Sequence, residues 1–169
     1  MRRRQSNHHL ALILIFLSIA CISVTSCKNN SEIYYHYNEI KDGEWAKYDT
    51  LYYTIDSTLF DTGMEYDIAL EVTNNVNYPY QNIWFFVRDN IDNDSTYSNI
   101  QKEFLLADKS GKWKGSGFGS LYQTTLGYKK AIRFADKRNY TIKVVHGMRD
   151  DVLSGIEKVG IKVSRHEGQ

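Results

Sequence analysis

The cysteines and histidines are the first residues to test for chemistry, because these side chains act as nucleophiles, proton carriers and metal ligands. Both cysteines, Cys21 and Cys27, lie near the N-terminus, so the rest of the chain can form neither a disulfide nor a cysteine nucleophile. The later histidines, His36, His146 and His166, lie far apart in the chain, and no HExxH-type pair is present. The sequence therefore predicts no metal site and no enzymatic activity.

One compact group of chemically active residues follows a predicted strand: His146, Arg149 and Asp150 in the run HGMRDD. An imidazole, a guanidinium and a carboxylate so close together could bind a ligand or a partner protein. The commoner alternative is a histidine that is hydrogen-bonded at a strand end and has a purely structural role. We name His146, Arg149 and Asp150 as candidate contact residues.

Two further motifs resemble ion or phosphate sites but differ in detail. Asp92 to Glu103 spans the length of an EF-hand loop, yet Tyr97 stands at the glycine position and the flanks have strand character. The glycine-rich run Gly115–Gly119 matches neither GxGxxG nor GxxxxGK[ST]. Glycine at alternate positions of an exposed strand more often makes room for a neighbouring aromatic ring.

The tryptophans divide into a contact candidate and core candidates. Trp113 lies between two lysines near a predicted turn, so we expect it to be exposed. Exposed tryptophan is typical of binding hot spots, and Trp113 with nearby Tyr122 is therefore a candidate contact for a partner or ligand. Trp45 and Trp84 are predicted to lie in the core.

The N-terminal segment has the pattern of an export signal. Three arginines precede Leu10–Val24, a mostly aliphatic run of fifteen residues, which is short for a membrane span of about 20 residues. Val24, Thr25 and Ser26 then precede Cys27, which resembles the bacterial lipobox; an ordinary secretory signal with an incidental cysteine is the alternative. The sequence predicts a lipoprotein signal peptide over residues 1–26, a covalent lipid on Cys27 as the only attached group, and a short tether over residues 27–32.

The remaining chain alternates apolar and polar residues in the manner of β-strands. The strands expected from this pattern lie at 51–55, 68–72, 82–88, 98–107, 112–114, 121–126, 131–134, 140–144 and 158–163. The segment 82–88 is apolar on both faces, which predicts a central strand, and 150–155 is expected to form at most one helical turn. Eight to ten short strands without a helical stripe predict a single antiparallel β-sandwich or jelly roll over residues 33–169.

The charge and the tyrosine content of the chain narrow the possible function and fold class further. The chain has 21 Lys and Arg against 20 Asp and Glu, a net charge of +1, which argues against nucleic-acid binding by bulk phosphate neutralisation. Loss of the three arginines with the signal peptide would leave 18 basic and 20 acidic residues. All thirteen tyrosines lie after the signal peptide, which favours a strand-rich domain.

Several segments, in this order, resemble the gliding-motility lipoprotein GldH family of Bacteroidota. They are the lipobox, Asn77–Trp84, Gly111–Gly115, Gly119–Gln123, Tyr140–Asp150 and Val159–Ile161. The resemblance implies a non-catalytic envelope lipoprotein that acts in gliding and in the associated secretion of adhesins, together with companion lipoproteins. Its one transferable site residue is the lipidated cysteine, here Cys27.

The expected location is the outer membrane on its periplasmic side, because Lys28 follows Cys27 where an acidic residue would mark inner-membrane retention. A second hypothesis is a glycan-binding jelly-roll lipoprotein. It predicts that Trp113 or neighbouring tyrosines form an exposed platform for sugar rings.

Overall fold

The structure is a computed structural model that describes residues 31–168. The predicted signal peptide, Cys27 and most of the predicted tether lie outside the described residues. From Ser31 onward the chain forms one compact unit.

Eleven strands lie within residues 31–168, against the eight to ten predicted. They are β1 (Glu32–Glu39), β2 (Glu44–Ala46), β3 (Leu51–Ile55), β4 (Tyr66–Asn75), β5 (Asn82–Asp89), β6 (Ile100–Leu105), β7 (Ser116–Phe118), β8 (Leu121–Ile132), β9 (Tyr140–His146), β10 (Val152–Ser154) and β11 (Ile156–Arg165). The helical elements of the same residues are two 3-10 turns, η2 (Lys41–Gly43) and η3 (Ser57–Leu59).

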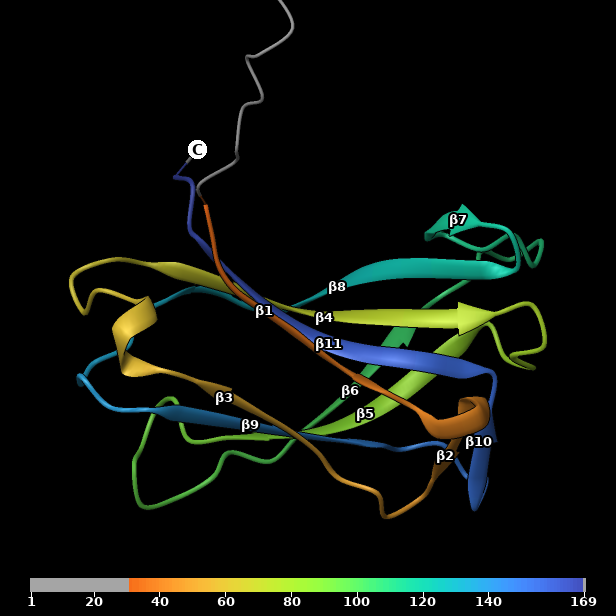
Figure 1. Cartoon of the computed structure of the whole chain (residues 1–169), viewed down its shortest axis with the longest axis horizontal. Coiled ribbons are helices and arrows are strands. Elements are labelled where there is room, and N and C mark those ends of the chain that lie inside the picture. Colours follow the sequence, from red (N-terminus) through yellow and green to blue (C-terminus); the bar gives the residue numbers. More distant parts are fainter. Residues whose placement is uncertain (1–30, 169) are drawn as a thin grey trace, which may run out of the picture. The chain divides into compact units, whose positions relative to one another are not determined.

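The strands build two main antiparallel sheets, which confirms the predicted antiparallel β-sandwich (Figure 1). The five-stranded sheet has the order β1-β11-β4-β8-β7, and the four-stranded sheet has the order β3-β9-β5-β6. A short pair, β2 with β10, closes the right-hand end in Figure 1. Both described chain ends lie together at the opposite end, where the Arg165 amide donates a hydrogen bond of 2.6 Å to the Ser31 carbonyl.

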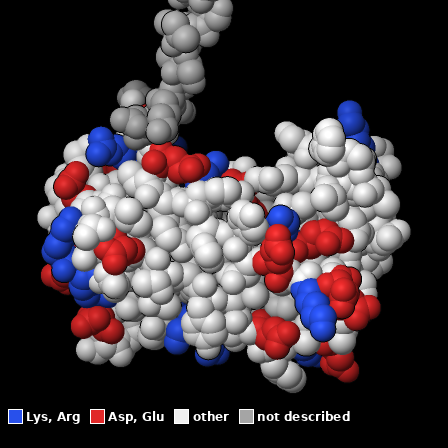
Figure 2. Space-filling model, in the orientation of Figure 1, with Lys and Arg blue, Asp and Glu red and all other residues white. Residues whose placement is uncertain are grey.

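The core forms between the inward faces of the two sheets, as strand alternation requires. The buried residues that alternate along the inner strands are Ile68, Leu70 and Val72 of β4, Ile83, Phe85 and Val87 of β5, Ile142 and Val144 of β9, and Val159, Ile161 and Val163 of β11. Full burial of each such side chain contributes about 1.5–3 kcal/mol of transfer free energy. On the outside, acidic and basic side chains are interspersed on the face shown in Figure 2, in keeping with the near-balanced composition.

A buried polar cluster fixes the end of β5. The carboxylate of Asp89 accepts hydrogen bonds from the Tyr128 hydroxyl, from Ser98 Oγ at 2.8 Å and from the Ile91 amide at 3.1 Å, and Lys129 Nζ lies 3.1 Å away. Burial alone would raise the pKa of Asp89, but the hydrogen bonds outweigh it and hold that pKa below its usual range. This cluster ties β5 to β8 across the sandwich and so positions the outward side chains of β5.

Three predictions about elements need correction. One twelve-residue strand, β8, replaces the two short strands expected at 121–126 and 131–134. Residues 152–154 form β10, not a helical turn, because they pair with β2. The expected strand 112–114 contributes a single bridge, from Trp113 to Ala107.

Two local findings complete the fold. The peptide bond before Pro79, the one proline of the sequence, is trans. No helix within residues 31–168 has the length and apolar character needed to cross a bilayer.

Candidate functional site

His146 ends β9 and lies beneath the surface. Its side chain is 1% exposed, and its ring packs edge-on against Trp45 with ring centroids 5.3 Å apart. Neither ring nitrogen has a hydrogen-bond partner among the described residues, and burial lowers the pKa of the imidazole. The structure therefore makes His146 a buried core residue, which corrects its selection as a surface contact and agrees with the structural role of the alternative.

Arg149 and Asp150 follow His146 in the loop from β9 to β10. Asp150 accepts a hydrogen bond of 2.8 Å from the hydroxyl of Tyr80, and this bond raises the pKa of Tyr80. Lys47 Nζ donates to the Arg149 carbonyl at 3.1 Å. Within residues 31–168 the exposed guanidinium of Arg149 makes no ion pair. The loop is thus held by Asp150 and by its backbone, while the Arg149 side chain is exposed.

Beside this loop, β5 presents two aromatic side chains to solvent. Trp84 is 39% exposed and Phe86 is 36% exposed, so the prediction that Trp84 lies in the core is wrong. The prediction of an inner strand is confirmed, because β5 pairs with β6 on one side and β9 on the other. The five-stranded sheet, however, covers only the inner face of β5, and the apolar residues on its outer face remain exposed.

The loop is joined to β5 by close contacts. The Gly147 amide donates a hydrogen bond of 2.6 Å to the Trp84 carbonyl, and the Trp84 amide donates to Met148 Sδ at 3.4 Å. A Cβ atom on Gly147 would lie 3.0 Å from Phe86 Cε2 and 3.2 Å from Trp84 Cβ. Glycine at this position lets the loop pack directly against both aromatic side chains.

Two hollows of about 550 and 490 Å³ flank the loop and share Phe86, Gly147, Met148 and Arg149 as lining residues. We call the surface formed by Trp84, Phe86, Arg88, Met148 and Arg149 the β5–β9 surface. Aromatic residues, methionine and arginine are the types enriched at protein interfaces. Sequence analysis named Arg149 as a candidate but did not name Trp84 and Phe86, because it showed only that they share one of the two apolar faces of the segment 82–88.

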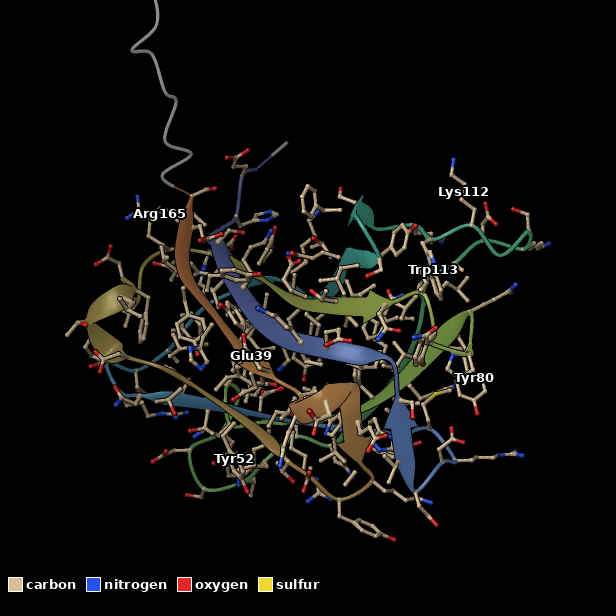
Figure 3. All side chains as sticks on the ribbon, turned by 45° about the vertical axis from the view of Figure 1, so that its right-hand side comes forward. Glu39, Tyr52, Tyr80, Lys112, Trp113 and Arg165 are labelled. Carbon is tan, nitrogen blue, oxygen red and sulfur yellow. The ribbon has the colours of Figure 1, made fainter. Side chains whose placement is uncertain are left out.

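Trp113 and Tyr122 lie on another part of the molecule. Trp113 is half-buried and packs between Tyr78 and Tyr122, with ring centroids 6.4 and 5.8 Å away. The expected exposure of Trp113 is therefore wrong, whereas neighbouring Lys112 extends outward in Figure 3. A Cβ atom on Gly117 would lie 2.7 Å from the Tyr122 ring, which confirms that a glycine here makes room for an aromatic side chain.

The titratable side chains of the described residues do not meet the requirements of a metal site. Within residues 31–168, no group of three or more His, Cys, Asp or Glu side chains comes close enough to hold a metal ion. The arrangement with the clearest chemical capacity is the β5–β9 surface, which offers exposed aromatic area and cationic side chains.

Comparison with known proteins agrees with the sequence motifs. A family model described as GldH lipoprotein matches residues 32–163. The gliding motility lipoprotein GldH homolog of Christiangramia forsetii is 26% identical over 160 residues, covering 90% of this chain and 96% of that protein. The gliding motility lipoprotein GldH of Flavobacterium johnsoniae is 24% identical over 159 residues, covering 89% of this chain and 95% of that protein.

Among solved structures, a carbohydrate-binding module of the CBM28 type is similar with a TM-score of 0.40 and 9% identity, covering 79% of this chain and 73% of that one. A likeness at this level supports no functional conclusion. The family match extends over most of the described residues and agrees with two relatives that align along nearly their whole length. This chain belongs to the GldH lipoprotein family.

Proposed function

We propose that this chain is a membrane-anchored envelope lipoprotein that acts in gliding motility by binding companion envelope proteins through the β5–β9 surface, without catalysing a reaction. Family membership supports the general role, since both curated relatives carry gliding-motility names. The observation that carries the binding role is the exposed pair Trp84 and Phe86 on an inner strand.

The pair is rigidly supported. Phe85, between them in sequence, is fully buried, and the Asp89 cluster fixes the end of the same strand. A rigid surface loses little conformational entropy on binding, so more of the contact energy appears as affinity. Buried aromatic anchors of this kind typically contribute at least about 2 kcal/mol each to an interface, or roughly thirtyfold in Kd.

Charge indicates what the partner presents. Arg88 and Arg149 make no ion pair within residues 31–168, and Lys143 Nζ lies 4.1 Å from the centroid of the Tyr97 ring on the same outer sheet face. A partner surface with apolar side chains surrounded by carboxylates would complement this pattern. The proposed occupant is therefore a companion lipoprotein with an acidic, partly apolar face.

The proposed anchor is a lipid on Cys27, with the outer membrane and its periplasmic side as the proposed location. Three residues lie between Cys27 and Ser31, and the four residue-to-residue steps span at most about 14 Å when extended. The domain would then stay close to the bilayer, while the β5–β9 surface lies at the end of the sandwich far from Ser31 (Figure 1). A Cys27→Ser variant that still incorporates labelled palmitate would contradict this anchor.

The binding role is tested by charge reversal, which leaves the core intact. A photoreactive amino acid placed at position 86 should cross-link to companion gliding lipoproteins, and Arg149→Glu should reduce that cross-linking. The same variant should lower the steady-state levels of these lipoproteins and slow gliding. Lys130→Glu is the matched control, because Lys130 is an exposed cation on β8, in the other sheet. Equal effects of both variants, or no effect of Arg149→Glu combined with Phe86→Ala, would contradict the proposal.

A further inference from the structure

The outer face of the five-stranded sheet carries a third hollow, lined by residues of β4, β7, β8 and β11. Its volume is about 540 Å³, and it is bounded on one side by β7. Figure 2 shows it as the notch in the upper outline, to the left of the block that contains β7 in Figure 1. Gln123 and Thr125 line this hollow, and Gln123 Nε2 donates hydrogen bonds to Glu71 and to the Tyr35 hydroxyl beside it. We call the hollow together with the neighbouring residues Tyr35, Tyr37 and Glu71 the outer trough.

Strand register brings these residues together from β1, β4 and β8, with β11 lying between β1 and β4. Tyr37 of β1 pairs with Gly160 of β11, which pairs with Glu71 of β4, which pairs with Thr125 of β8. The next outward row in the same register contains Glu39, Lys158, Thr73 and Gln123. A Cβ atom on Gly160 would lie 3.0 Å from the His36 carbonyl oxygen and 3.2 Å from Tyr37 Cβ, so glycine here lets Tyr37 pack closely over β11.

Glu71 is the organising residue of the trough. It points outward from β4 and yet is only 4% exposed. Its carboxylate accepts hydrogen bonds from Thr125 Oγ1 at 2.9 Å and Gln123 Nε2 at 3.1 Å, and Lys162 Nζ lies 3.2 Å away. Burying a carboxylate is costly unless it is well paired, so this network holds the trough's polar groups in fixed positions.

The charges in the trough are paired internally. Lys162 pairs with Glu71, and Lys158 Nζ lies 3.0 Å from Glu39 Oε1 and 4.5 Å from the centroid of the Tyr37 ring. The trough therefore offers hydrogen-bonding groups without an unpaired charge. A neutral ligand that carries many hydroxyl groups suits such a surface better than an anion or a cation.

Aromatic rings complete the site at the β1 rim. Tyr35 and Tyr37 are 44% and 43% exposed, their ring centroids lie 6.2 Å apart, and the Tyr35 hydroxyl accepts a hydrogen bond of 3.3 Å from Gln123 Nε2. A sugar ring has an apolar face that can pack on an aromatic side chain, and hydroxyl groups at its edge that bond to amides, hydroxyls and carboxylates. We propose that the outer trough binds a neutral oligosaccharide.

The position of the trough disfavours an extended peptide as the occupant. Peptides that add to a sheet bond to the free backbone groups of an edge strand. The floor of the trough is formed by β11, β4 and β8; β11 and β4 pair with neighbours on both sides, and β7 pairs with β8 at Leu121–Gln123. The backbone groups of β11 and β4 are already used by their neighbours. Recognition at the centre of the trough must therefore come from side chains.

The test uses the mature lipoprotein in amine-oxide micelles, which contain no sugar. Isothermal titration with cellohexaose, mannohexaose, xylohexaose and chitohexaose should show saturable binding of at least one of them with a Kd of about 1 mM or tighter. Tyr37→Ala should weaken that binding at least about tenfold. Tyr37→Phe should keep it within about threefold if the ring supplies the contact.

Tyr52→Ala is the matched control, because Tyr52 is an exposed tyrosine near a lysine on the other sheet. It should leave oligosaccharide binding unchanged. No saturable binding of any of the four sugars at about 10 mM, tighter binding of oligogalacturonate than of all of them, or equal losses in Tyr37→Ala and Tyr52→Ala would overturn the proposal. These outcomes are independent of the β5–β9 surface, which lies on the four-stranded sheet.

Discussion

Replacing Tyr128 by phenylalanine should lower the stability of the domain while leaving both proposed binding surfaces in place. The Tyr128 hydroxyl donates a hydrogen bond to Asp89 inside the sandwich, where both side chains are buried. Hydrogen bonds to charged groups contribute about 1.5–3 kcal/mol. Because Ser98 and Lys129 remain as partners of the carboxylate, the loss should stay within that range and should not approach the larger cost of an unpaired buried charge.

The assay is urea-induced unfolding at pH 7, followed by thermal unfolding, in which the expected loss corresponds to roughly 5–12 °C in Tm. Tyr52→Phe is the control, because Tyr52 is exposed, and should change stability by less than about 0.5 kcal/mol. Since the folded-state pKa of Asp89 lies below 3.8, its stabilising contribution is complete above pH 3.8 and is lost as the pH falls through the folded pKa. A loss below about 0.5 kcal/mol at pH 7, or a difference that grows toward acidic pH, would refute this reasoning.

Three further perturbations have clear expectations. Gly155→Ala should lower the free energy of unfolding by about 2–5 kcal/mol, because at φ +88° the new Cβ atom would lie 2.6 Å from Tyr78 Cα. Gly63→Ala is the control. It should leave the free energy of unfolding nearly unchanged in the same assay, because no atom lies within 4 Å of the new Cβ. Leu70→Ala should leave a cavity in the core and lower the free energy of unfolding by about 2–5 kcal/mol. Denaturant unfolding measures this loss. Burial lowers the folded-state pKa of His146, so its stability contribution is complete above about pH 6.5 and falls below it; an unfolding free energy with the same pH slope in His146→Gln would contradict this.

The alternation of apolar residues predicted the inner strands well, because one face of each packs into the core. The segments around Ile68 and Val159 lie in β4 and β11 as expected. β1 was not predicted as a strand, since its tyrosines occupy both faces and mask the alternation. β2 and β10 are three residues each and pair across more than a hundred positions of sequence, so local pattern carries almost no information about them.

The binding surfaces were harder to predict, for a physical reason. A strand that is apolar on both faces indicates that both faces are covered, but the sequence does not say whether another layer of the same fold or a second protein provides the cover. Trp84 was assigned to the core on this ground, and the structure shows it exposed. Trp113 was misjudged in the opposite direction, because its packing partners Tyr78 and Tyr122 come from segments whose proximity depends on the tertiary fold.

The two proposed sites belong to different sheets, and this separation has a consequence for how the protein works. Trp84 and Phe86 lie on the outer face of the four-stranded sheet, and Tyr35 and Tyr37 on the outer face of the five-stranded sheet, with the core between them. Occupation of one face leaves the other accessible, so a single tethered domain could hold a companion protein and a glycan at the same time. Effects of mutations at distant sites without shared partners are normally additive. Free-energy losses from Phe86→Ala in partner binding and from Tyr37→Ala in sugar binding should therefore be independent, and a strong effect of either variant on the other ligand would show that the two faces are coupled.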